Sequence, residues 1–155
     1  KLNATGHLNA KARPLKQHEN ISVFSEGSAT STSLTMCYNP QGLFDVDITK
    51  INFETETTGK RQSRAKGKEW KQTKSGYPKS ILTFAYDKDK LHPTQKPLEL
   101  MKYLISTYSN ENDMVLDNTM GSGTTCLASK ELNRKFIGIE KEPKYYEIAC
   151  QRCGF

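Results

Sequence analysis

The sequence predicts an α/β fold in which a partial Rossmann-like unit follows an irregular and basic region. Residues 114–116 form a short apolar run that predicts a buried strand, and this run ends on Asp117. A Gly-Ser-Gly turn comes next, and Thr124 and Thr125 then open a segment whose apolar residues share one helix face. A second strand is predicted over 135–140. Strand, glycine turn, helix and strand follow one another in this order in parallel α/β units.

The glycine turn has the composition of a ligand-binding turn. Gly121 and Gly123 adopt positive φ readily, and with Ser122 between them they bring the backbone close to a ligand. The helix that follows presents its N-terminal N–H groups to that ligand. Glu140 ends the second strand 23 positions after Asp117, and this spacing suits a carboxylate that accepts hydrogen bonds from ribose hydroxyls.

The turn alone leaves several ligand types to compare. A phosphate-binding loop requires Gly-Lys-Ser/Thr, and no lysine follows Gly123, so that class is excluded. A dinucleotide fingerprint requires a third Gly or Ala where the register offers Cys126. An adenosyl ligand without phosphates remains, and so does a tight turn between packed elements that binds nothing.

Strand signals elsewhere are weaker. Short strands are predicted over 21–24 and 78–84, and an extended stretch or strand pair over 43–53. Residues 54–76 contain almost no aliphatic side chain, so this segment is not expected to fold alone.

Two helices flank the predicted unit. Pro97 suits the first position of a helix with an apolar face that continues to Tyr108. The second helix begins with Pro143 and is predicted to stop at Gly154.

The bulk composition limits the class of protein. The chain has 155 residues and a mass of 17.5 kDa, so one hydrophobic core is expected. A hydrophobic content of 35% and a mean hydropathy of −0.72 are low for a compact α/β domain. No run reaches the length of a membrane span and no signal peptide opens the chain, so we expect a cytoplasmic protein. Because the first residue is Lys1 rather than Met, we expect a processed or trimmed product.

The net charge of +6 is concentrated in one segment. Residues 60–79 hold eight basic side chains against the single acid Glu69, which gives +7 there and leaves −1 for the rest of the chain. Basic side chains with an interleaved tryptophan predict a loop that contacts DNA, and the alternative is an ordinary solvated charge run. The predicted DNA contacts are Lys60, Arg61, Arg64, Lys66, Lys68, Trp70, Lys71 and Lys74.

Four cysteines are too few and too irregularly spaced for a disulfide framework. Cys150-x-x-Cys153 has no second pair to complete a zinc site, so reduced thiols are expected and no metal ligand is assigned.

Three motifs together resemble a known enzyme family. Residues 92–97 read His-Pro-Thr-Gln-Lys-Pro, residues 116–125 read Leu-Asp-Asn-Thr-Met-Gly-Ser-Gly-Thr-Thr, and residues 138–140 read Gly-Ile-Glu. These strings resemble the DNA amino-methyltransferases that use S-adenosylmethionine, in the permuted group whose catalytic half comes first and whose cofactor half comes last. Segments 9–24 and 38–41 are also similar to that family.

The resemblance implies a methyltransferase fold in three parts. Residues 1–41 correspond to the end of the catalytic region and a linker, 42–90 to the DNA target-recognition region, and 91–155 to the Rossmann-like half that binds the cofactor. In that half, Thr94 and Lys96 are expected near the methionine carboxylate and Glu140 at the ribose. The complete set of implied cofactor-binding residues is His92, Thr94, Lys96, Asp117, Gly121, Ser122, Gly123, Thr124, Thr125 and Glu140.

The tetrapeptide that holds the target base in this family, Asp/Asn/Ser-Pro-Pro-aromatic, has no counterpart in the sequence, which contains no Pro-Pro pair. No catalytic residue is therefore assigned, and the chain is expected to carry only the cofactor and recognition parts. Adenine-N6 transfer is favoured over cytosine-N4 transfer, and a non-catalytic DNA-binding remnant or subunit is the alternative.

The resemblance also implies partners and an origin. Double-stranded DNA is the expected partner, together with a missing N-terminal catalytic half or a second copy of the chain, and no membrane partner is expected. A bacterial, phage or prophage source follows from the family.

Overall fold

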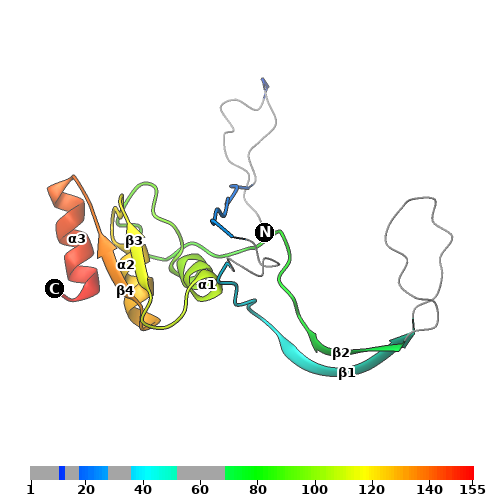
Figure 1. Cartoon of the computed structure of the whole chain (residues 1–155). Helices are drawn as coiled ribbons and strands as arrows, with labels where there is room; N and C mark the ends of the chain where they lie inside the picture. The colour runs from blue at the N-terminus through cyan, green and yellow to red at the C-terminus, as the bar shows by residue number, and fades with distance from the viewer. Residues whose placement is uncertain (1–10, 13–17, 28–35, 52–68) are drawn as a thin grey trace. The chain divides into compact units, whose positions relative to one another are not determined.

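The computed structural model describes residues 11–12, 18–27, 36–51 and 69–155, and it contains two compact units. One unit comprises Asn39–Ser80, and the other combines Lys1–Tyr38 with Ile81–Phe155. Figure 1 shows the elements of both. The smaller unit contains the strands β1 (Phe44–Ile51) and β2 (Glu69–Ser75). The larger unit contains α1 (Leu98–Tyr108), β3 (Met114–Asp117), α2 (Thr124–Glu131), β4 (Lys135–Gly138) and α3 (Pro143–Cys153).

The larger unit is built on a parallel strand–helix–strand arrangement, which confirms the α/β prediction. Strands β3 and β4 pair in parallel, with Leu116 opposite Ile137 and Asp117 opposite Gly138. Helix α2 connects them and packs against both strands, and helices α1 and α3 pack against α2 (Figure 1). The carboxyl ends of both strands therefore meet at the edge where the glycine turn lies.

Small side chains fill the space around α2. The buried apolar residues are Ile105, Cys126, Ala128, Ala149 and Cys153, and four buried polar residues accompany them, namely Thr107, Ser122, Thr124 and Ser129. The buried hydroxyls form hydrogen bonds, since Thr107 Oγ1 donates to Tyr103 O at 2.6 Å and Ser129 Oγ to Thr125 O at 2.8 Å. Apart from Ile105, these buried side chains are small.

The other face of the β3–β4 sheet is exposed. Met114, Leu116, Ile137 and Ile139 have exposed fractions of 57%, 61%, 48% and 53%. The prediction of a buried strand over 114–116 is therefore wrong for the side chains on this face. Successive side chains of a strand point to opposite faces, and α2 packs on the face that carries Val115 and Phe136.

The helix limits agree closely with the predicted ones. Helix α3 begins at Pro143 and is capped by Gly154 with φ 77°, as predicted. Pro97 is the N-cap of α1 rather than its first residue. The carboxylate of Asp87 accepts a hydrogen bond from the Leu98 N–H at 3.1 Å, which satisfies one of the first donors of α1.

The smaller unit is an antiparallel pair of strands. Phe44 lies opposite Ser75 and Ile51 opposite Glu69, with an irregularity in the register between Asp45 and Ile48. The stretch 43–53, predicted as a strand pair or an irregular extended segment, contains the single strand β1, and residues 52–53 lie outside the described residues. The prediction that 54–76 does not fold alone missed β2, whose polar residues form a strand because β1 supplies the hydrogen-bonding edge.

Two predicted strands are wrong. Residues 21–24 and 78–84 have no strand conformation, and Phe24 and Ile81 are largely exposed. Both segments contain residues that are typical of strands, but a strand also requires a neighbouring strand with which to pair. In the described part of the chain, only β1 pairs with β2 and β3 with β4. No helix in the described part of the chain has the length and apolar character needed to cross a membrane.

A matched pair of glycine substitutions tests how closely α3 packs on the turn. A Cβ at position 123 would lie 2.7 Å from the Ala149 Cβ, whereas one at position 154 meets only the flexible end of Lys130 at 3.2 Å. Both glycines have positive φ, 75° and 77°. Each Gly→Ala change should lower the free energy of unfolding by about 1–2 kcal/mol, because alanine is disfavoured in the left-handed region. Gly123→Ala should lower it by about 1–3 kcal/mol more, because the added Cβ overpacks the contact with Ala149. Urea unfolding measures both, and equal losses would contradict the close approach.

Candidate functional site

The turn between β3 and α2 is held by backbone hydrogen bonds at the carboxyl end of the sheet. The Gly123 N–H donates to Met120 O at 2.8 Å, and the Met120 N–H donates to Ile139 O at 3.0 Å. Gly121 and Gly123 have φ values of 53° and 75°, in the left-handed region that glycine adopts without strain. Gly123 is the N-cap of α2, and within the described residues no side chain caps this helix. The first N–H groups of α2 therefore receive no hydrogen bond from an N-cap side chain, and the residues of the turn, 121–124, are buried.

Glu140 lies against this turn. Its Oε2 accepts a hydrogen bond from the Gly121 N–H and its Oε1 accepts one from the Glu142 N–H, both at 2.9 Å. The Glu142 N–H, followed by the Gly121 N–H and by the nearby His92, lowers the pKa of this carboxyl below its usual range. The ionised carboxylate retains acceptor capacity for hydroxyl donors of a ligand.

The His-Pro-Thr-Gln-Lys-Pro string lies beside the turn. The His92 ring contacts the Tyr145 ring edge-on, with 4.2 Å between centroids, and a Cβ on Gly121 would lie 3.5 Å from the same imidazole. The Thr94 N–H donates to His92 Nδ1 at 3.2 Å, which fixes the string locally. Lys96 Nζ forms an ion pair with Glu19 Oε2 at 2.6 Å.

The remaining predicted cofactor residues divide into two groups. Asp117 ends β3, and its Oδ1 accepts a hydrogen bond from the Thr119 N–H at 3.1 Å. Ser122 and Thr124 are only 2% and 6% exposed, so their side chains face the protein interior. The Thr125 hydroxyl lies 3.6 Å from Met101 Sδ. Ser122 and Thr124 are therefore buried as whole residues, and Thr125 is half-buried.

Two further residues contact the turn. Arg152 was not predicted from the sequence, and Gln95 was left without an assigned role. Arg152 Nη1 donates to the Ser122 carbonyl at 2.7 Å, and Gln95 Oε1 accepts from Ser122 Oγ at 3.1 Å. A signal for Arg152 was present in the sequence, because Ala149 and Arg152 are three positions apart on a helix and share one face.

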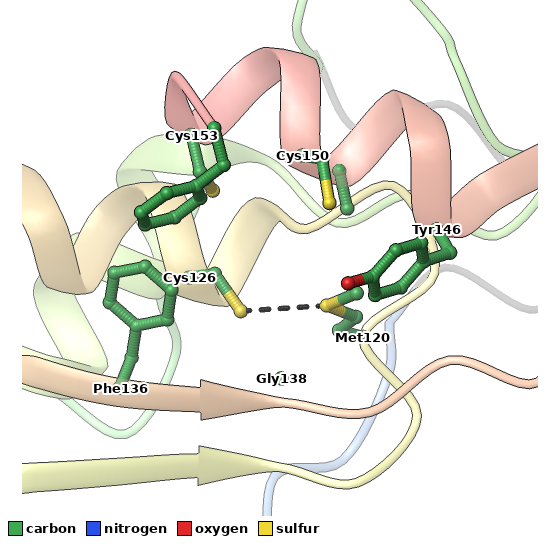
Figure 2. A pocket seen from close by; sticks show the side chains of 9 residues that line it. Met120, Cys126, Phe136, Gly138, Tyr146, Cys150 and Cys153 are labelled. Atoms are coloured by element: carbon green, nitrogen blue, oxygen red, sulfur yellow. Dashed lines mark hydrogen bonds between the residues drawn. The ribbon is translucent and has the colours of Figure 1, made fainter.

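Sulfur-containing side chains line a cavity of about 150 Å³ on the helix side of the sheet (Figure 2). Cys126 Sγ lies 3.7 Å from Met120 Sδ, and α3 contributes Tyr146, Cys150 and Cys153. Burial raises the pKa of Cys126 to about 11 and also raises the pKa of Cys153. None of the four cysteines, all of which the structure describes, forms a disulfide, and the described residues contain no cluster of three or more side chains able to hold a metal ion. The cavity is therefore lined mainly by apolar and sulfur-containing side chains.

The predicted DNA-contacting residues fall in two places. Lys60, Arg61, Arg64, Lys66 and Lys68 lie outside the described residues. On β2, Lys71 pairs with Asp47 at 2.9 Å, and Lys74 pairs with Asp45 at 2.6 Å. Lys50 lies 5.2 Å above the Trp70 ring. The positive charges of β2 are thus matched by acids on β1.

A family model described as DNA methylase matches residues 2–151. The chain belongs to this family. The match confirms the resemblance to the DNA amino-methyltransferases.

Three bacterial proteins are similar to part of the chain. The type II methyltransferase M.HindIII of Haemophilus influenzae is 57% identical over 63 residues, which cover 41% of this chain and 20% of that protein. M2.LlaDCHI of Lactococcus lactis is 49% identical over 61 residues, covering 39% of this chain and 23% of the relative. M2.DpnII of Streptococcus pneumoniae is 48% identical over 61 residues, with the same coverage. Each match thus spans about a fifth of the relative's length.

Two solved structures are similar as well. M1.HpyAVI, in a complex with SAM, is 32% identical with a TM-score of 0.41, and the match covers 74% of this chain and 64% of that one. The cytosine-N4-specific PvuII DNA methyltransferase is 22% identical with a TM-score of 0.47, and the match covers 68% and 49%.

The hydrogen bonds to Glu140 predict its titration. Because both carboxylate oxygens accept backbone N–H bonds, the group should titrate below its usual value of about 4.3. A lowered folded-state pKa stabilises the fold fully above the unfolded pKa, and this contribution is lost as the pH falls through the folded value. Carbon-detected NMR of the side chain measures it, with Glu140→Gln identifying the resonance. Titration at or above about 4.3 would show that these bonds are absent in solution.

Proposed function

We propose that this chain carries the cofactor-binding and DNA-recognition parts of a site-specific DNA methyltransferase that acts on an exocyclic base amine. The observation that carries the proposal is the turn at residues 121–123, where left-handed glycine backbone, the uncapped start of α2 and the Glu140 carboxylate converge. Membership of the DNA methylase family supports the same function.

S-adenosylmethionine is the cofactor that these residues fit. Its ribose hydroxyls can donate hydrogen bonds to Glu140. At its amino-acid end, the ammonium group complements Asp117 and the carboxylate complements Lys96. Without a Cβ, Gly121 lets the ligand approach the backbone beside His92. The cofactor supplies an activated methyl group, so the task of these side chains is to bind and orient it.

The target-base pocket is proposed to come from another polypeptide segment. The sequence contains no Pro-Pro-aromatic motif, and the apolar face formed by Met114, Leu116, Ile137 and Ile139 is exposed. Parallel sheets are ordinarily covered on both faces. We propose that a catalytic region, upstream in the same protein or in a partner subunit, covers this face in the bacterial cytoplasm. Alternatively, a second copy of the chain covers this apolar face. The alternative function is that of a DNA-binding subunit without catalytic activity.

DNA contacts are proposed to concentrate in the segment between β1 and β2. The two strands are together neutral, with Asp45, Asp47 and Glu69 against Lys50, Lys71 and Lys74. Residues 52–68 carry five basic side chains and two acids. The excess positive charge that attracts phosphates therefore lies in that segment.

Adenine-N6 remains the favoured target over cytosine-N4.

Cofactor binding is tested by calorimetric titration of S-adenosylmethionine into the 155-residue chain. Glu140→Ala removes the carboxylate at the turn and should raise the Kd for S-adenosylmethionine by about 5- to 150-fold. Asp113→Ala is the matched control, because Asp113 also accepts a backbone N–H, that of Asn110 at 2.8 Å, but precedes β3. Equal effects of the two variants would remove Glu140 from the site.

Methyl transfer is tested with labelled S-adenosylmethionine and mixed-sequence duplex DNA. The chain alone should transfer no methyl groups at an enzymatic rate, because misplacement of the base by about 1 Å can slow a reaction about a hundredfold. Adding an upstream fragment that contains the Pro-Pro-aromatic motif should restore transfer. Robust transfer by the chain alone would refute the division of roles.

The DNA proposal is tested by the salt dependence of binding. Changing Arg61, Arg64, Lys66 and Lys68 to Gln should flatten the log–log slope by about 0.9 for each phosphate that is no longer neutralised. Lys71→Gln with Lys74→Gln serves as the control, since both side chains are paired with acids. An unchanged slope in the first variant would identify the segment as a solvated charge run.

A further inference from the structure

Arg152 contacts the glycine turn from the last turn of α3. Its Nη1 atom donates to the Ser122 carbonyl at 2.7 Å and lies 3.2 Å from Ser122 Oγ and 3.0 Å from Thr124 Oγ1. Both partner residues are buried. A guanidinium group that donates hydrogen bonds to two residues restricts the relative position of those residues more than a single hydrogen bond does.

The Ser122 carbonyl depends on this contact. This carbonyl lies one residue before the first backbone acceptor of α2, since the first helical hydrogen bond runs from the Leu127 N–H to Gly123 O. Buried carbonyl groups that lose their partner are strongly unfavourable, so removal of Arg152 favours rotation of the Ser122–Gly123 peptide. The flanking glycines have the backbone freedom that such a rotation requires.

The contact is not explained by stabilisation of α2. A cation beside the N-terminus of a helix opposes the helix dipole, and the first turn of α2 contains no acidic residue to offset it. Arg152 therefore places positive charge where α2 itself disfavours it. The same charge favours an anionic group at this end of the helix.

Ser122 extends the contact to the His-Pro-Thr-Gln-Lys-Pro string. Ser122 Oγ donates to Gln95 Oε1 at 3.1 Å, and Gln95 Nε2 donates to Asp87 Oδ2 at 3.0 Å. The other oxygen of Asp87 accepts from the first N–H of α1, on Leu98. One hydrogen-bonded network thus joins α3, the turn, the string and the start of α1.

We propose that Arg152 is a positioning residue that holds the backbone of residues 121–124 in the shape that binds S-adenosylmethionine. This inference rests on the proposed cofactor function. Arg152 acts through the Ser122 carbonyl rather than by touching the methyl group. The network through Gln95 keeps the two cofactor-binding segments in register with each other.

The test compares Arg152→Met and Arg152→Lys with Lys130→Met in the 155-residue chain. Lys130 is the matched control because its Nζ donates to Cys153 O at 2.5 Å, and so it also joins α2 to α3 without touching the turn. Calorimetry with S-adenosylmethionine should give a Kd about 10- to 100-fold higher for Arg152→Met. Arg152→Lys should recover part of this loss, since an ammonium group can still donate to the Ser122 carbonyl. Lys130→Met should bind like the wild type.

A second measurement separates this proposal from the cofactor proposal. Without ligand, the Gly121 and Gly123 amide resonances in nitrogen–proton NMR spectra should shift or broaden in Arg152→Met and remain unchanged in Lys130→Met. If the wild type does not bind S-adenosylmethionine, the cofactor proposal fails and the glycine resonances still decide whether Arg152 holds the turn. Unchanged resonances in Arg152→Met, or equal losses of affinity in both Met variants, would overturn the positioning role.

Discussion

The absence of a side chain at position 123 is the constraint on which the larger unit depends. A Cβ there would lie 2.7 Å from the Ala149 Cβ, so only glycine lets α3 approach the turn this closely. The approach brings Arg152 within 2.7 Å of the Ser122 carbonyl and the Tyr145 ring against His92. A helix displaced by one methyl group would lose these interactions, because packed interiors tolerate little extra volume.

Charged groups of opposite sign then hold neighbouring peptide groups of the turn. The Glu140 carboxylate accepts from the Gly121 N–H, and the Arg152 guanidinium donates to the Ser122 carbonyl. Each group matches the polarity of its partner, so the two hydrogen bonds favour one orientation of the intervening backbone. A turn ordered before the ligand arrives loses less conformational entropy on binding.

Local signals explain how much of the fold was predictable. The limits of β3, α2, β4 and α3 follow from apolar runs, glycines and proline, each of which acts within a few residues. The false strand at 78–84 and the missed β2 depend on whether a partner strand exists, which composition does not reveal. The contact between Glu140 and the glycine turn agrees with the spacing in the sequence, whereas Arg152 reaches Ser122 from 30 positions away through the packing of α3.

The two faces of the β3–β4 sheet differ in a way that connects fold and function. The helix side is packed with small residues, and the other side presents Met114, Leu116, Ile137 and Ile139 to solvent. Large apolar side chains on a parallel sheet favour a covering layer, since their burial is worth about 25 cal/mol for each Å² removed from water. Asp117 and Glu140 directly follow this face at the carboxyl ends of the strands. A layer that covered this face would therefore lie beside the proposed cofactor site.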